Sequence, residues 1–304
     1  MSVLVTGSIG IDTIEAPAGR VDCVLGGSAV YFAAAASFFA PVRFVAVAGE
    51  DMPEGFLTPL EAMGTIDTSG LEIRRGSATF RWSGRYHDDI NHRDTLDVQL
   101  GVLAEVGPTI PEPLRDSPYV FLANTHPALQ LELIEQLTAP KLIVADTMNL
   151  WIENEAETLA ALLSRIDGII LNDSEARLLT GETNTIIAAD RIRRMVRRFV
   201  VVKKGEHGSV LLTDGKIFVL PAYPSLTVVD PTGAGDSFAG AMMGYVADAD
   251  TTDAATLLTG MAYGTVVASL ELEDFSLDKL KHITRADIDE RFAEFVTMTR
   301  IGAA

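Results

Sequence analysis

Short apolar runs recur along the chain, and segments with helical character stand between most of them. The runs have the length of a strand and carry almost no charge, as is typical of parallel strands that are buried on both faces. Alternation of such strands with helices predicts an α/β fold: a Rossmann-like, mostly parallel sheet with helices on both faces. The predicted strands are residues 3–6, 44–48, 120–123, 142–145, 168–171 and 200–203.

The intervening segments differ in how much of their surface is apolar. Residues 28–40 are rich in alanine and carry no charge, which predicts a helix buried all round. Residues 155–164 and 185–198 are amphipathic, which predicts helices that cover the sheet. The part of the chain after Pro231 is predicted to be mostly helical.

Residues 71–100 break this pattern, because they alternate polar and apolar side chains and contain β-forming residues such as Trp82 and Tyr86. Alternation of this kind predicts antiparallel strands with one wet face. Residues 11–25 also have strand character, so we expect the two segments to form a small separate sheet, here called the lid. The chain is predicted to be a single domain, residues 1–304, that carries this lid.

Composition narrows the classes of function. The chain has 24 Lys and Arg against 42 Asp and Glu, a net charge of −18, and such a surface repels nucleic acid and anionic lipid. The single cysteine, Cys23, indicates a reducing compartment rather than a disulfide scaffold. Without a basic, apolar leader at the N-terminus, the sequence predicts a cytoplasmic protein. No apolar stretch is long enough to span a bilayer.

The strongest local pattern is VVDPTGAGDSFAG, residues 228–240. Gly233 and Gly235 flank Ala234, Asp236 follows at once, and a helix of small residues is predicted after it. Unpaired N–H groups at a helix start bind anions, phosphate above all, and a carboxylate there can act as a general base. The alternative is a glycine-rich turn in which Asp236 only caps the helix.

This signature resembles that of the PfkB, or ribokinase-like, kinases. Four further segments precede this signature and stand in the same order as in the family. They are Asp12 after the first strand, Gly26-Gly27, the N-x-x-E motif at 172–175, and the turn at 203–208. Five ordered landmarks are far more specific than any one of them. The resemblance covers nearly the whole chain.

The resemblance implies a role for each matching residue. Asp236 is the expected catalytic base, and the N–H groups of Gly233, Ala234 and Gly235 are the expected anion hole for the transferring phosphoryl group. The expected substrate-binding residues on the acceptor side are Asp12, Gly26, Gly27 and Tyr31.

ATP and Mg²⁺ are the implied cofactors. Asn172 and Glu175 would organise Mg²⁺ through water, although Asn172 in this position can also cap the next helix. Lys203 and Gly205 are expected on the nucleotide side, with a solvated lysine as the alternative for Lys203.

Asp230 and Thr232 match part of a K⁺ site found in many family members. The later segment that completes that site, residues 268–275, lacks the usual glycine.

One departure bears on the substrate: Tyr31 stands where ribokinases usually carry asparagine, which puts ribose in doubt. The sequence thus predicts an ATP-dependent kinase that phosphorylates a primary hydroxyl of a small sugar. A nucleoside kinase is the first alternative, and a nucleotide-binding sensor without catalysis is a weaker one. An NAD-dependent dehydrogenase is weaker still, because the glycine fingerprint after the first strand is incomplete. The expected partners are the acceptor, ATP and a second copy of the chain bound through the lid.

Overall fold

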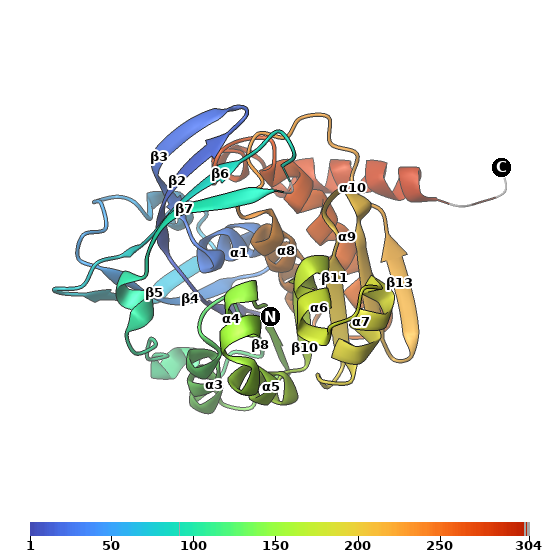
Figure 1. The fold of residues 1–304 in the computed structure, drawn as a ribbon, viewed down its shortest axis with the longest axis horizontal. Helices are drawn as coiled ribbons and strands as arrows, with labels where there is room; N and C mark the ends of the chain where they lie inside the picture. Colours follow the sequence, from blue (N-terminus) through green and yellow to red (C-terminus); the bar gives the residue numbers. More distant parts are fainter. Residues whose placement is uncertain (91, 301, 303–304) are drawn as a thin grey trace.

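The structure of the chain, a computed structural model, describes residues 1–90, 92–300 and 302. A nine-stranded sheet runs through it in the order β13-β12-β11-β10-β9-β8-β1-β4-β5 (Figure 1). Neighbouring strands are parallel except for the pairs β11–β12 and β12–β13. The strands are β1 (Val3–Thr6), β4 (Val42–Gly49), β5 (Ile66–Arg74), β8 (Tyr119–Leu122), β9 (Leu142–Ala145), β10 (Gly168–Asn172), β11 (Phe199–Lys203), β12 (Ser209–Thr213) and β13 (Lys216–Leu220).

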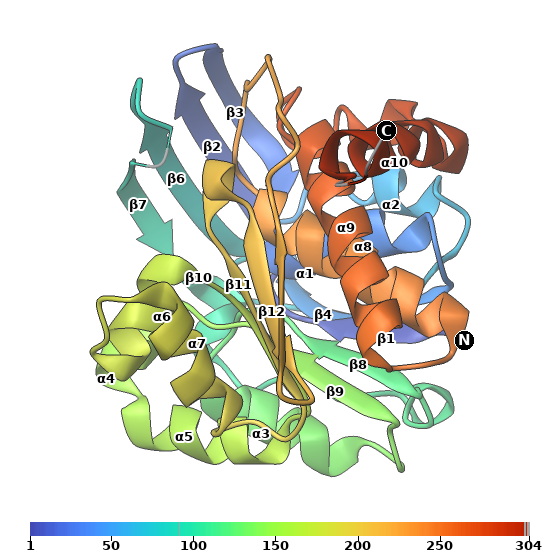
Figure 2. The ribbon, with the colours of Figure 1, turned by 90° about the vertical axis from the view of Figure 1, so that its right-hand side faces the viewer.

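Helices cover both faces of this sheet (Figure 2). Alternate strand residues enter two separate cores, Val5 with one helical layer and Leu4 with the other. This arrangement explains why the strands are apolar throughout, and it confirms the predicted fold class. One layer contains α1 (Ser28–Ser37), α2 (Thr58–Glu61), α8 (Ala234–Ala249), α9 (Ala254–Glu271) and α10 (Arg285–Thr299). The other contains α3 (Pro127–Gln136), α4 (Asn149–Asn154), α5 (Ala156–Arg165), α6 (Asp173–Thr180) and α7 (Thr185–Arg193).

The lid is a second sheet of four strands, in the order β3-β2-β6-β7, that stands off the main one (Figure 1). Its strands are β2 (Gly10–Ala16), β3 (Gly19–Gly26), β6 (Phe80–Tyr86) and β7 (Arg93–Gln99). The start of the range predicted for the lid, residues 71–74, lies instead at the end of β5. Because β5 is an edge strand of the main sheet, it carries the same mixture of polar and apolar residues as a lid strand.

Two helices end earlier than their patterns predict. The helix from residue 28 ends at Ser37, three residues before the predicted end at 40, and the helix from residue 185 ends at Arg193 rather than at 198. None of the helices in the described ranges has the length and apolar character needed to cross a membrane.

The antiparallel hairpin of β12 and β13 was not predicted. Its turn is Asp214-Gly215, with φ angles of 48° and 71°. An Asp-Gly pair between two strands favours this kind of turn, so the signal is present in the sequence.

Candidate active site

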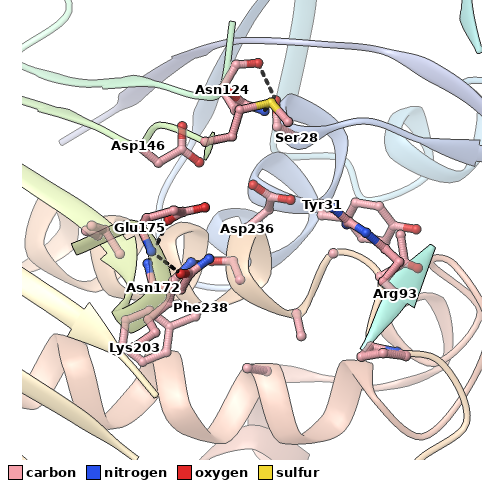
Figure 3. A pocket seen from close by; sticks show the side chains of 18 of the residues that line it. Ser28, Tyr31, Arg93, Asn124, Asp146, Asn172, Glu175, Lys203, Asp236 and Phe238 are labelled. Atoms are coloured by element: carbon pink, nitrogen blue, oxygen red, sulfur yellow. Dashed lines mark hydrogen bonds between the residues drawn. The ribbon is translucent and has the colours of Figure 1, made fainter. Parts of the chain in front are cut away.

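A pocket of about 1490 Å³ opens at the carboxyl ends of the parallel strands, between the lid and the start of α8 (Figure 3). β1 has β4 on one side and β8 on the other. The direction in which successive strands join the sheet therefore reverses at β1. Crevices at such reversals are the usual ligand sites of open α/β sheets. Of the residues predicted for the site, Asp12, Gly27, Tyr31, Asn172, Glu175, Lys203, Gly205, Thr232, Gly233, Ala234, Gly235 and Asp236 line this pocket.

Asp236 lies half-buried in the first turn of α8 and faces the pocket. Burial raises its pKa to about 6, and the nearby Glu175 carboxylate acts in the same direction. The Lys203 ammonium opposes this shift. Lys203 Nζ also donates a hydrogen bond of 3.2 Å to the carbonyl oxygen of Gly235, which brings its charge to the start of α8. Asp236 is therefore a carboxylate whose proton affinity is tuned toward neutral pH.

The turn before α8 requires glycine at one position. Gly233 has a φ of +87°, and a Cβ there would lie 2.3 Å from the ring of Tyr31, which is 1% exposed. The N–H groups of Gly235 and Asp236 have no hydrogen-bond acceptor among the described residues, whereas Ala234 N–H donates to Pro231 O at 3.3 Å. The free donors point to a site for an anion at the start of α8. Ala234 contributes less to it than the sequence indicated.

Asp12 lies in β2, and it is 4% exposed. Its Oδ1 has no hydrogen-bond partner in the described part of the chain. Gly26 lies directly against it, since a Cβ on Gly26 would be 1.9 Å from Asp12 Oδ2. Burial, followed by the charge of Asp230, raises the pKa of Asp12 to about 7. A buried carboxylate with a free oxygen is suited to bind a hydroxyl group.

Gly27 allows the chain to enter α1. Its φ is +105°, and a Cβ there would lie 2.4 Å from the carbonyl oxygen of Ser8. The same junction holds Ser8 and Ser28, whose hydroxyl oxygens are 3.1 Å apart. Ser28 Oγ also donates to the carbonyl oxygen of Asn124 at 3.4 Å, which ties β1, α1 and the end of β8 together.

Asn172 and Glu175 form a capping box at the start of α6. Asn172 Oδ1 accepts from Glu175 N–H and Glu175 Oε2 accepts from Asn172 N–H, both at 2.8 Å. The capping interpretation of Asn172 is therefore realised. Both side chains still line the pocket, and Glu175 is 9% exposed. Burial raises the pKa of Glu175.

Asp146, at the end of β9, was not predicted from the sequence. It is 8% exposed, its Oδ1 has no partner among the described residues, and its side chain faces the same space as Glu175 and Asp236 (Figure 3). Burial, with the charge of Asp236 next, raises its pKa well above the usual value. A lone aspartate after a strand has no distinguishing spacing, so only the fold reveals it.

Two aromatic side chains that the sequence did not single out lie near Asn124. Trp151 Nε1 donates to Asn124 Oδ1 at 2.9 Å, and the ring centroids of Trp151 and His126 are 5.0 Å apart. On the lid side, Phe80 and Trp82 line the pocket. Apolar and aromatic walls therefore border the polar groups at Asp12, Ser28 and Asn124.

Asp230 and Thr232 differ in position: Thr232 lines the pocket, whereas Asp230 does not. Asp230 is fully buried and accepts from Thr232 N–H at 2.8 Å and Ser276 N–H at 3.3 Å. Thr232 Oγ1 donates to Tyr86 Oη of the lid at 3.1 Å. The sequence did not identify Glu271, which is fully buried at the end of α9 with neither carboxylate oxygen partnered in the described ranges.

Known proteins resemble this chain over most of its length. The family described as "pfkB family carbohydrate kinase" matches this chain over residues 129–279. A cytidine kinase from Thermococcus kodakarensis is 32% identical over 255 residues, which is 81% of this chain and 88% of that protein.

Solved structures share the fold at lower identity. A Burkholderia thailandensis nucleoside kinase in complex with inosine aligns with a TM-score of 0.78 and 20% identity, covering 97% of this chain and 99% of that one. A Methanocaldococcus jannaschii nucleoside kinase, an archaeal member of the ribokinase family, aligns with a TM-score of 0.76 and 20% identity over 96% and 98%. The glycine signature, the pocket at the strand ends and these likenesses agree. The chain belongs to the pfkB family of carbohydrate kinases, and it is a phosphotransferase with an alcohol group as acceptor.

Proposed function

We propose that the chain transfers the γ-phosphoryl group of ATP to the primary hydroxyl of a nucleoside. The observation that carries the choice of acceptor is the aromatic lining around its half of the pocket, Phe80 and Trp82 on the lid and Trp151 near Asn124. A sugar alone would leave these surfaces against water, whereas a nucleobase would cover them. The cytidine kinase relative and the inosine-bound neighbour support the same choice.

Asp12 and Asp236 would divide the acceptor chemistry between them. Asp12, with its free and buried Oδ1, would accept a hydrogen bond from a ribose hydroxyl. Asp236 would take the proton of the primary hydroxyl as its oxygen attacks the γ-phosphorus, and ADP would leave as the β–γ bridging bond breaks. The free N–H groups of Gly235 and Asp236 would hold the transferring group.

The donor set fits Mg²⁺ held mainly by phosphates and water. Asp146, Glu175 and Asp236 face one space, and Asp146 Oδ1 has no partner there among the described residues (Figure 3). In the ranges that the structure describes, no three acidic, histidine or cysteine side chains could hold an ion unaided. Magnesium keeps several waters, so such a set suffices. When bound, Mg²⁺ would neutralise charge on the phosphates.

We further propose that a monovalent cation such as K⁺ binds beside Asp230. The resemblance in sequence pointed to Asp230 and Thr232 as parts of this site. The structure adds Glu271, a buried carboxylate whose oxygens lack partners in the described part of the chain. A buried, unpaired carboxylate must bind a cation or a proton. Comparison of rates in potassium and tetramethylammonium salts, for wild type and Glu271→Gln, tests this proposal. Equal rates in both salts would exclude it.

A substrate panel tests the proposed acceptor. With ATP and Mg²⁺, we expect higher kcat/KM for cytidine, adenosine or inosine than for ribose or fructose. The variant Trp151→Leu should lower the value for the best nucleoside and leave any residual ribose activity unchanged. Sugars used as efficiently as nucleosides would contradict the proposal and favour the small-sugar kinase.

Since ATP is the donor, we also propose a cytoplasmic location, which imaging of a tagged chain would test.

A further inference from the structure

Asn124 presents a side-chain amide to the pocket on the side where α1 begins. It follows β8, is half-buried and lines the pocket, and its backbone carbonyl oxygen accepts from Ser28 Oγ at 3.4 Å. Figure 3 shows it beside Ser28, with Lys203 on the other side of the pocket. An amide offers a ligand either hydrogen-bond donors or an acceptor, depending on where its nitrogen and oxygen point. The orientation of this amide therefore decides what Asn124 can bind.

The indole of Trp151 fixes that orientation. Trp151 Nε1 donates to Asn124 Oδ1 at 2.9 Å, and because an indole N–H can only donate, the amide oxygen must face it. The Trp151 ring is itself held, since its centroid lies 5.0 Å from that of His126. His126 is anchored at the start of α3, where its Nδ1 accepts from Ala128 N–H at 3.1 Å. A reversed amide would set two donors against each other and lose the bond to Trp151.

The amide nitrogen of Asn124 has only a weak partner. Among the described residues, Nδ2 contacts Met148 Sδ alone, at 3.1 Å. A thioether sulfur is a weak hydrogen-bond acceptor, and Nδ2 carries two hydrogens. Met148 and Leu150, on the same segment as Trp151, also line the pocket, so the lining here is largely apolar. A ligand with a hydrogen-bond acceptor would satisfy this donor, whereas a ligand without one would leave it unpaired.

We propose that Asn124 is a specificity-determining residue, whose amide N–H donates to a carbonyl oxygen or an unprotonated ring nitrogen on the edge of the nucleobase. Trp151 is the positioning residue, because its indole N–H keeps the amide from turning over. The aromatic walls of the pocket would cover the faces of the base, and Asn124 would select its edge. The inference rests on the proposed nucleoside kinase function and adds the kind of atom on the base that the pocket recognises.

A series of adenosine analogues tests the free donor. The compounds 1-deaza-, 3-deaza- and 7-deazaadenosine each replace one ring nitrogen by C–H, and purine riboside lacks only the exocyclic amino group. For wild type, one deaza analogue should lose at least about tenfold in kcat/KM relative to adenosine, because it leaves the Asn124 donor unpaired. Purine riboside should lose little. If cytidine is the better substrate, then 2-thiocytidine, 3-deazacytidine and pyrimidin-2-one riboside replace these compounds.

Three variants assign this loss to Asn124 and Trp151. In Asn124→Leu the loss should disappear, because no donor remains to be left unpaired. Trp151→Phe keeps the aromatic ring but lacks the N–H, so the amide can turn over and the loss should shrink. Trp82→Phe is the matched control, since Trp82 lines the same pocket but donates to Thr95 Oγ1 at 3.3 Å, and the loss should persist. Each loss compares two substrates of one protein, so it does not depend on the fraction that is folded.

The outcomes separate this inference from the proposed function. If ribose is phosphorylated and no nucleoside is, both fail. If nucleosides are phosphorylated but no loss of a ring nitrogen or carbonyl matters for wild type, or the loss persists in Asn124→Leu, this inference alone is wrong. A loss caused by removal of the exocyclic amino group that disappears in Asn124→Leu would mean that Asn124 accepts rather than donates, and it would also overturn the inference.

Discussion

Asp236 meets two conditions for a proton acceptor at the level of a single residue. It lies at a helix start with free N–H donors beside it, and its pKa is raised to about 6 by burial. Such a carboxylate is ionised at pH 7 yet binds a proton more readily than an ordinary aspartate.

The variant Asp236→Asn should keep the fold and nucleotide affinity but lower kcat by roughly 10²–10⁴-fold, the range for loss of a general base. The wild-type rate should fall as the pH drops through about 6, because Asp236 must be ionised to act. The variant's residual rate should lack this acidic limb. Steady-state kinetics between pH 5 and 9, with Asp190→Asn as a surface control, checks both effects. Near wild-type turnover would remove Asp236 from catalysis.

The buried carboxylate of Asp12 makes the stability of the folded state depend on pH. Its folded pKa of about 7 exceeds the ordinary 3.8, so the folded state binds a proton more tightly than the unfolded state. Its contribution to stability is therefore fully present below about pH 4 and is lost as the pH rises through about 7.

We expect Asp12→Asn to raise the free energy of unfolding at pH 8 by about 2 kcal/mol, since each pKa unit corresponds to about 1.4 kcal/mol and the new amide offsets part of the gain. Near pH 4 the variant and wild type should be equally stable. The same change should raise KM for the acceptor strongly and leave KM for ATP nearly unchanged. Denaturant titrations at both pH values test the first expectation, and a variant that is less stable at pH 8 would contradict it.

At the scale of elements, contact with α1 constrains the turn at the start of α8. The Tyr31 ring of α1 lies against Gly233, so the proposed anion site depends on a contact between two helices that are distant in the sequence. Gly233→Ala should distort this turn, lower kcat and weaken ATP binding by at least about tenfold, because both the backbone conformation and the ring exclude a Cβ. Isothermal titration with an ATP analogue measures the effect.

Gly235→Ala is the matched control for that change. It adds the same methyl group two residues later, where φ is not positive and the close neighbour is the flexible end of Lys203. We expect a smaller loss of ATP affinity and little change in melting temperature. Similar losses in both variants would show that Tyr31 does not constrain the turn.

Glu175 caps α6 and is also proposed to act at the Mg²⁺ site, and one substitution can separate these two roles. In Glu175→Gln the amide oxygen can still accept from Asn172 N–H, so the capping box of α6 and the stability should persist. The charge is lost, so a higher Mg²⁺ concentration should be needed for half-maximal activity. Asp173→Asn removes a charge from the same first turn of α6 and should leave the Mg²⁺ titration unchanged. An unaltered titration for Glu175→Gln would exclude it from the proposed metal site.

For the molecule as a whole, the lid leaves two strand edges uncovered, on β3 and β7. All of β7 is exposed, and Leu96 and Val98 each expose 46% of their surface. Exposed edges of this kind pair with other strands. Dimerisation through the lid thus stays a prediction: light scattering should report a dimer, and Leu96→Lys should shift it toward monomer. A wild-type monomer at all concentrations would contradict it.

The sequence predicted most of the main sheet because its strands are buried on both faces and are uniformly apolar. It placed residues 71–74 in the lid because an edge strand alternates polar and apolar residues just as a half-wet sheet does. Motif residues were found where spacing is informative, as for Asn172 and Glu175. Asp146 and Glu271 carry no such spacing, and their burial and neighbours arise only from tertiary packing.

The contact between Tyr86 Oη and Thr232 Oγ1 joins the lid to the loop that precedes the proposed anion site. If the acceptor favours the lid position in which this bond forms, it also favours the conformation of the loop that is proposed to bind the nucleotide. Thermodynamic reciprocity then requires each substrate to tighten binding of the other by the same factor. The enzyme would thereby hold ATP weakly until an acceptor is present, which limits futile hydrolysis. The variant Tyr86→Phe, which lacks the hydroxyl, should reduce this factor. The reduction should be equal whether it is measured as the effect of ATP on acceptor binding or of the acceptor on ATP binding.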